Sequence, residues 1–147
     1  MDDESTRAHP GREAAAMGEW IAALVALAVP STARCDALAA LDVVRALAWT
    51  SGDRRLLAAA YAPGSGVDDT DRLRAWNERG IRVEGARTLR ASCRDRGAHE
   101  VEVVERLGPT VAVLPDGSRQ TLPTDAWDRR VVALGHRGGW WRIERVR

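Results

Sequence analysis

Histidine is the side chain best suited to acid–base catalysis near neutral pH, and this chain has three histidines. His9 lies in a polar N-terminal segment and His136 lies in a predicted hairpin turn, so we expect both to be solvated. His99 has the same parity as Val101 and Val103 in a predicted strand, which places it beneath the helices as a candidate general base. The interpretation that we favour is a histidine at a sheet edge that bonds to the backbone.

Three glutamates follow His99 and raise the question of paired catalytic carboxylates. Glu100 and Glu102 alternate with valines, a pattern that is typical of the solvated face of a strand. Glu105-Arg106 breaks the alternation and predicts a bulge with an internal ion pair. These carboxylates therefore indicate strand geometry more than chemistry.

The aromatic residues are six Trp and one Tyr, with no Phe, so indole rings must fill space that Phe usually takes. Four of the aromatic side chains are candidates to line a binding cavity: Tyr61, Trp76, Trp127 and Trp141. A small apolar ligand would suit such a cavity, although we favour core packing for these rings. The strand parity of Trp141 places it on the side toward the helices.

The two cysteines, Cys35 and Cys93, are 58 positions apart and form no CxxC pair or Cys/His cluster. The sequence therefore predicts no metal site. In an exported protein a disulfide between them would add roughly 3–4 kcal/mol to stability. The alternative, which we favour slightly, is two buried thiols. No glycine-rich phosphate loop opens a helix, so no cofactor is expected either.

The charge pattern bears on polyanionic partners. All 22 basic residues are Arg, yet 21 acids interleave with them and leave a net charge of +1. Residues 1–80 hold 9 Arg and 12 acids, and residues 81–147 hold 13 Arg and 9 acids. Because a nucleic-acid-binding domain usually clusters its positive charge, we expect no nucleic-acid partner.

The N-terminal third is the least regular part of the chain. Residues 1–19 are polar and we expect disorder there, whereas residues 20–34 begin with ten apolar residues that Pro30 follows. Ten residues are too few to span a bilayer. The segment is the remnant of an export signal or anchor, or a short buried helix, and we lean toward the former. The protein is then at the cell envelope or secreted, and cytoplasmic under the alternative; any membrane contact is through this segment.

Residues 35–147 form the predicted domain. Apolar residues at helical spacing predict three helices, at residues 36–50, 53–61 and 68–79. From Ile81 the period changes to two, so that Leu89, Ala91 and Cys93 share one face. This alternation predicts about six antiparallel strands, within residues 81–94, 99–103, 110–114, 119–122, 127–135 and 140–146. A run of helices before a run of strands favours an α+β fold.

Several motifs carry a resemblance to a known superfamily. They are Asp42-x-x-Arg45-Ala46-x-Ala48-Trp49-x-x-Gly52-Asp53-x-x-Leu56, Tyr61-x-Pro63-Gly64-Ser65, Arg79-Gly80-Ile81-Arg82-Val83-x-Gly85 and Gly139-Trp140-Trp141-Arg142-Ile143. Residues 36–147 resemble the nuclear transport factor 2-like (cystatin-like) superfamily, and within it a group of small proteins from high-GC bacteria that an export or membrane segment often precedes. The resemblance implies three helices packed in the concave face of a curved antiparallel sheet, which together form a cone.

The resemblance also shapes the functional hypotheses. Enzymes similar to this superfamily often use an Asp–His pair inside the cone, which here would join His99 to Asp42 or to Asp125. That arrangement would suit a dehydratase, isomerase or cyclase. We rank two hypotheses above it: a non-catalytic binding or protein-interaction module at the cell envelope, and an accessory domain that forms a homodimer through its open sheet face.

Overall fold

A computed structural model of the protein describes residues 32–147. The predicted tail, residues 1–19, and most of the apolar segment, residues 20–34, lie outside these residues. Among the helices that the structure describes, none combines the length and the apolar character needed to cross a membrane.

Three helices open the described part of the chain: α2 (Thr32–Ser51), α3 (Arg54–Ala59) and α4 (Val67–Glu78). Helix α2 starts four residues before the predicted helix. Gly52, with a φ of 73°, separates α2 from α3. The predicted N-cap of α3 is confirmed, because the Asp53 carboxylate accepts hydrogen bonds from the backbone N–H groups of Arg55 and Leu56, at 2.8 and 3.2 Å.

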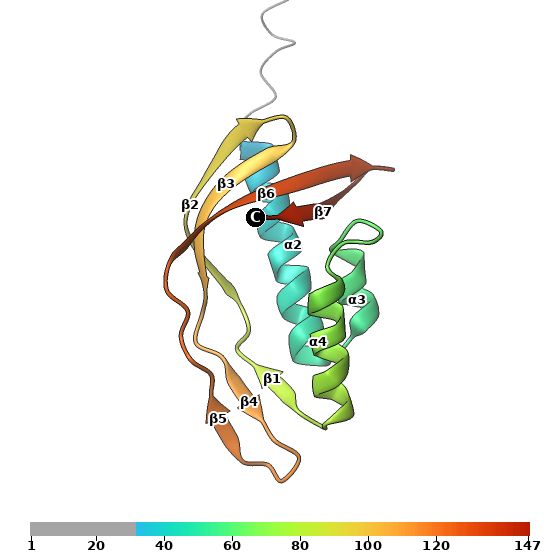
Figure 1. Ribbon diagram of the computed structural model, residues 1–147, viewed down its shortest axis with the longest axis vertical. Helices are drawn as coiled ribbons and strands as arrows, with labels where there is room; N and C mark the ends of the chain where they lie inside the picture. Colours follow the sequence, from blue (N-terminus) through green and yellow to red (C-terminus); the bar gives the residue numbers. More distant parts are fainter. Residues whose placement is uncertain (1–31) are drawn as a thin grey trace, which may run out of the picture. The chain divides into compact units, whose positions relative to one another are not determined.

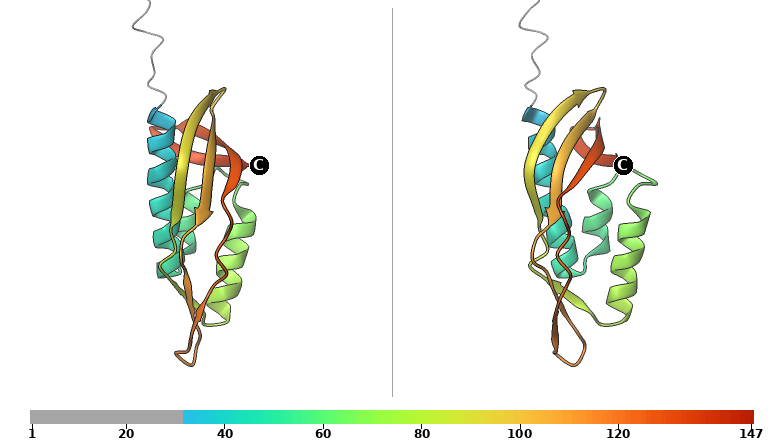
Figure 2. Two further views of the ribbon diagram at one scale, coloured as in Figure 1. Left: turned by 90° about the vertical axis from the view of Figure 1, so that its left-hand side faces the viewer. Right: turned by 60° about the vertical axis from the view of Figure 1, so that its left-hand side comes forward.

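Seven strands follow, and they form two antiparallel sheets. The larger sheet has the order β2-β3-β6-β7, with β2 at Thr88–Gly97, β3 at Glu100–Leu107, β6 at Asp128–Arg137 and β7 at Trp140–Val146. The smaller sheet has the order β1-β4-β5, with β1 at Arg82–Glu84, β4 at Val111–Val113 and β5 at Arg119–Thr121. Both views in Figure 2 show the β4–β5 hairpin at the opposite end of this unit from the β2–β3 turn. The predicted α+β class with antiparallel strands is confirmed.

The division into two sheets arises within the segment that the sequence predicted as one continuous stretch of strand, residues 81–94. Gly85 has a φ of 73°, and a Cβ atom there would lie 3.0 Å from the carbonyl oxygen of Pro109. This left-handed residue interrupts the extended chain, so β1 ends before it and β2 begins after it.

One apolar core joins the helices to the larger sheet. Figure 1 shows the three helices on one side of β2 and β3. Each helix contributes leucines, and β3, β6 and β7 contribute the opposing aliphatic side chains; the most buried members are Leu38, Leu57, Leu73, Val101, Val103, Val132, Leu134 and Ile143. Burying one such side chain contributes roughly 1.5–3 kcal/mol, so this contact dominates the stability of the unit.

Two further connections fasten α2 and the last strand. A disulfide joins Cys35 on α2 to Cys93 on β2, and beside it Arg34 pairs with Asp95 at 2.6 Å. At the other side of the core, Ile143 on β7 exchanges backbone hydrogen bonds with the α3–α4 loop, donating to the Ala60 carbonyl (2.9 Å) and accepting from the Ala62 N–H (2.8 Å).

The faces of β2 and β3 differ from the sequence prediction. The register of β2 against β3 shifts between Arg90 and Ser92, so the bulge lies on β2 and not at Glu105-Arg106. The shift turns Arg90 toward the helices together with Cys93, and it leaves Leu89 on the opposite face and Ala91 exposed. The predicted inward positions of Leu89 and Ala91 are therefore wrong.

The predicted position of His99 is also wrong. Strand β3 begins at Glu100, and His99 lies in the two-residue turn that connects β2 to β3, with a φ of 66° and an exposed side chain. The alternation of Val101 and Val103 is real, but it starts one residue after the histidine. His136, which the sequence placed in a turn, lies in β6 and is exposed, and its ring lies 4.7 Å from that of Trp141.

Candidate functional site

A network of charged side chains lies between the helices and the inner face of β2 and β3. Arg90 on β2 reaches two carboxylates, Glu105 on the neighbouring strand at 2.7 Å and Asp42 on α2 at 2.5 Å. Arg90 and Glu105 are partners in the strand register, so the pair sits directly across the two strands. Asp42 and Glu105 are both less than 10% exposed, at 9% and 8%. The network therefore couples α2 to the sheet through buried charges.

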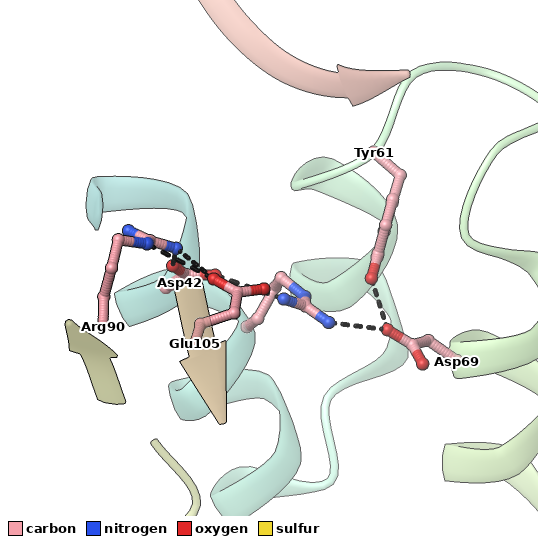
Figure 3. A network of polar contacts seen from close by, with 6 residues as sticks. Asp42, Tyr61, Asp69, Arg90 and Glu105 are labelled. Atoms are coloured by element: carbon pink, nitrogen blue, oxygen red, sulfur yellow. Dashed lines mark hydrogen bonds and ion pairs between the residues drawn. The ribbon is translucent and has the colours of Figure 1, made fainter. Parts of the chain in front are cut away.

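The network continues from Asp42 toward α4, as Figure 3 shows. Arg45, one turn along α2, donates to Asp42 at 3.1 Å and to Asp69 on α4 at 3.0 Å. Tyr61 completes the chain of contacts, because its hydroxyl donates to the same Asp69 carboxylate. Six polar side chains thus link α2, α4, β2, β3 and the loop that follows α3.

The surroundings of these groups fix their protonation states. Burial raises the pKa of Tyr61, and the neighbouring Asp69 carboxylate adds to the rise. Burial alone would also raise the pKa of Asp69, but the Tyr61 hydroxyl and the Arg45 guanidinium outweigh it and lower that pKa below its ordinary value. Burial opposes the Arg45 charge, yet Tyr61 and Asp69 raise its pKa overall. At neutral pH the three groups are a neutral phenol, a carboxylate and a guanidinium.

Beside the network lies a cavity of about 350 Å³. Its walls come from α2, α4 and both sheets, and the network residues Arg45, Asp69 and Glu105 form part of its lining. Trp49 on α2 and Trp76 on α4 meet edge to face, with ring centroids 5.9 Å apart. The apolar remainder of the lining includes Val83, Leu107 and Leu122.

Four arginines and three acids line the cavity, and most of them have partners. Arg45 and Glu105 belong to the network, and Arg130 pairs with Asp128 at 3.1 Å. Within residues 32–147, Arg72, Arg106 and Asp125 make no ion pair. Two of these three are cations, so the unpaired charge at the cavity is positive.

Arg106 is held in an unusual environment. Its guanidinium lies over the ring of Trp127, 4.7 Å from the ring centroid. Its Nε atom is buried and has no hydrogen-bond partner among the described residues. A buried donor without an acceptor is costly, and the contact of the guanidinium with the Trp127 ring offsets part of that cost.

The residues that the sequence singled out are dispersed. Asp125 and Trp76 line the cavity, and Tyr61 reaches it through Asp69. Trp127 is 48% exposed and lies outside the lining, where it supports Arg106. Trp141 packs against the core. His99 is in the β2–β3 turn, so no Asp–His pair forms with Asp42, whose contacts are Arg45 and Arg90.

Most of the polar lining could not be recognised in the sequence. Arg45 stands in the motif that begins at Asp42, and the i, i+3 spacing of an acid and an arginine on a helix was the available signal for that pair. Arg90 gave no signal, because a strand alternation without the bulge places it in water. Arg72 and Arg106 gave none either, since arginines are frequent throughout the chain.

Two absences complete the description of the site. Among residues 32–147, no cluster of three or more His, Cys, Asp or Glu side chains has an arrangement that could hold a metal ion. Neither the comparison with protein-family models nor the comparison with curated proteins finds a match to the chain.

Proposed function

We propose that this chain is a non-catalytic binding domain whose cavity holds a small organic anion with a flat apolar body. The observation that carries the proposal is the cavity of about 350 Å³ that combines a tryptophan corner with two arginines, Arg72 and Arg106, that have no carboxylate partner within residues 32–147. Ligand pockets typically measure roughly 300–1,000 Å³ and have an apolar lining with a few polar anchors.

The two kinds of lining suggest which part of a ligand each would contact. The Trp49–Trp76 pair, with Val83 and Leu107 nearby, offers an apolar surface suited to a ring system. The guanidiniums of Arg72 and Arg106 offer N–H groups that match a carboxylate, sulfonate or phosphate. A ligand with both features would use both surfaces at once.

The protonation states support binding over catalysis. A general base needs a lone pair that is free to accept a proton near neutral pH. Asp69 and Glu105 already accept hydrogen bonds from arginines, and the pKa of Asp69 lies below its ordinary value, with burial opposing this and the Tyr61 and Arg45 contacts causing it. The dehydratase, isomerase or cyclase alternative rests on Asp125, the one lining carboxylate without an ion pair in residues 32–147.

The resemblance to the nuclear transport factor 2-like superfamily supports the same site. In that arrangement the helices lie in the concave face of a curved sheet and the cavity opens within the cone. We extend the proposal to location: the Cys35–Cys93 disulfide fits an oxidising compartment, since disulfides are rare in reducing cytosol. The domain would then act at the cell envelope or outside the cell.

The test uses two probes that differ in one charged group, anilinonaphthalene sulfonate and its neutral analogue phenylnaphthylamine, and measures fluorescence titrations. We expect the sulfonate to bind and the R72Q/R106Q variant to bind it about tenfold more weakly, as loss of charge-assisted hydrogen bonds implies. The control R54Q/R55Q removes two exposed arginines outside the cavity and should leave the titration unchanged.

The outcomes separate the parts of the proposal. If both probes bind equally and the R72Q/R106Q variant binds them as the native protein does, the cavity is a binding site without a preference for anions. Binding that survives Ala86→Phe, which fills the cavity, would reject the site itself, provided that the melting curve shows a folded variant.

A further inference from the structure

The face of the larger sheet that points away from the helices carries a concentrated set of arginines. On β3, Val101 and Val103 are fully buried toward the helices, so Glu100 and Glu102 point to the opposite face. Glu102 contacts three arginines from both neighbouring strands: Arg94, Arg96 at 3.4 Å and Arg129 at 3.5 Å. One carboxylate thus serves three guanidiniums.

Glu100, the neighbour of Glu102 on the same face of β3, has the same role. It contacts Arg145 on β7 at 3.3 Å and Arg147, the residue after that strand, at 2.9 Å. The side chains of Glu100 and Glu102 are only 19% and 13% exposed, whereas those of the five arginines are 47–70% exposed. The carboxylates therefore lie underneath, and the guanidiniums form the outer layer.

The charge of this face differs from that of the chain. We define the arginine face as the five arginines Arg94, Arg96, Arg129, Arg145 and Arg147 together with Glu100 and Glu102. Its five positive and two negative side chains leave a surplus of three positive charges, while the whole chain has a net charge of +1. The sequence, which interleaves the two signs, conceals this clustering.

We propose that the arginine face docks the domain on the surface of an anionic lipid bilayer. The arginine face matches such a bilayer in the sign of its charge and in its two-dimensional extent. The arginines come from β2, β6 and β7, with β3 between them, so they cover a two-dimensional area, as a layer of phosphate headgroups does. Glu100 and Glu102 are positioning residues that hold the guanidiniums above the sheet.

Other polyanions fit this face less well. Single-stranded nucleic acid is held largely by stacking of bases on aromatic rings. The outward residues in the register around the arginine face are aliphatic or small: Ser92, Val104, Val131 and Ala133. The disulfide also fits a compartment outside the cytosol, which disfavours an intracellular nucleic acid as the partner.

The experiment is co-sedimentation of the full chain with vesicles of phosphatidylcholine that contain or lack about 30 mol % phosphatidylglycerol. The test variant is R94Q/R129Q/R145Q. The matched control is R54Q/R55Q/R79Q, which removes three exposed arginines from the helical side that make no ion pair among residues 32–147. Both variants change the net charge by the same amount, so only the position of the charge differs.

We expect binding to the anionic vesicles only, weakening as salt is raised. The test variant should bind about a hundredfold more weakly, the effect of three basic side chains at an anionic surface. The control should change binding less than about threefold. Equal losses in the two variants would mean a response to net charge alone and would overturn the proposal. Binding to double-stranded DNA or an acidic protein, with none to vesicles, would overturn it as well.

Discussion

Glu105 and Glu102 lie three positions apart on β3 and belong to opposite faces of the same sheet. Glu105 faces the helices, is 8% exposed and shares Arg90 with Asp42. Glu102 faces away and is surrounded by three exposed arginines. Both are Arg–carboxylate clusters, yet the inner one has three carboxylates for two arginines, whereas the outer one has five arginines for two carboxylates. Burial accounts for the smaller surplus of charge inside, because an unpaired charge costs more where water is absent.

The largest effect that we predict comes from breaking the inner cluster. Arg90→Met keeps an apolar stem of similar length but leaves Glu105 buried without a cation. We expect it to lower the free energy of unfolding by about 3–5 kcal/mol. Urea denaturation measures the loss, and Arg94→Met on the outer face of the same strand is the matched control. A loss as small as that of the control would show that Glu105 is hydrated, and the contrast between the faces would fail.

The disulfide joins the same helix and strand as the Arg90–Asp42 contact, at a different point. We expect Cys35→Ser/Cys93→Ser to cost about 3–4 kcal/mol, since it frees a loop of 58 positions in the unfolded chain. Urea denaturation of the variant and of the reduced native chain should give the same value. Unequal values would mean that the serines disturb the folded state, and an unchanged midpoint would mean that the inner network alone fastens α2.

The pH dependence of stability should also separate the two clusters. The folded-state pKa of Asp69 is lowered, with burial opposing and the Tyr61 and Arg45 contacts outweighing it. Its contribution is therefore complete above the unfolded-state pKa near 4 and is lost as the pH falls toward the folded-state pKa. The difference in unfolding free energy between native and Asp69→Asn should shrink from pH 6 to pH 3, because the stabilisation from the carboxylate is lost as the pH falls below the unfolded-state pKa. A constant difference would remove Asp69 as an acid-sensitive group.

The smallest effect belongs to the outer cluster. Glu102→Gln should change the free energy of unfolding by less than about 1 kcal/mol, because exposed ion pairs contribute little. The loss should be larger at low salt than at high salt, since the remaining arginines repel one another and salt screens them. Thermal melts at the two salt concentrations measure this. A cost that matches that of Arg90→Met would place Glu102 in a buried network too.

The three helices and the hairpin between β4 and β5 could be predicted from the sequence because local rules determine them. Apolar spacing defines α2 and α4, Asp53 caps α3, and Asp116 accepts from the Ser118 N–H in the predicted turn. Such signals lie within a few residues of one another, so no knowledge of distant contacts is needed to recognise them.

The candidate site could not be predicted in the same way. Arg90 enters it through a bulge on β2, and a bulge reverses the side on which every residue before it lies. His99 lies outside the site because it is the last residue of the β2–β3 turn, whereas strict alternation places it in the strand. The cavity itself needs Trp49, Trp76 and Arg106, which come from three elements and meet only after the helices pack on the sheet.

Strand β7 holds the α3–α4 loop through the bonds of Ile143 to Ala60 and Ala62, and Ser65 adds a hydroxyl bond to the Glu144 carbonyl at 2.7 Å. These contacts join residues that are about 80 positions apart in the sequence. Because contacts between distant residues close long loops and form slowly, we expect the α3–α4 loop to become ordered only when β7 joins the larger sheet.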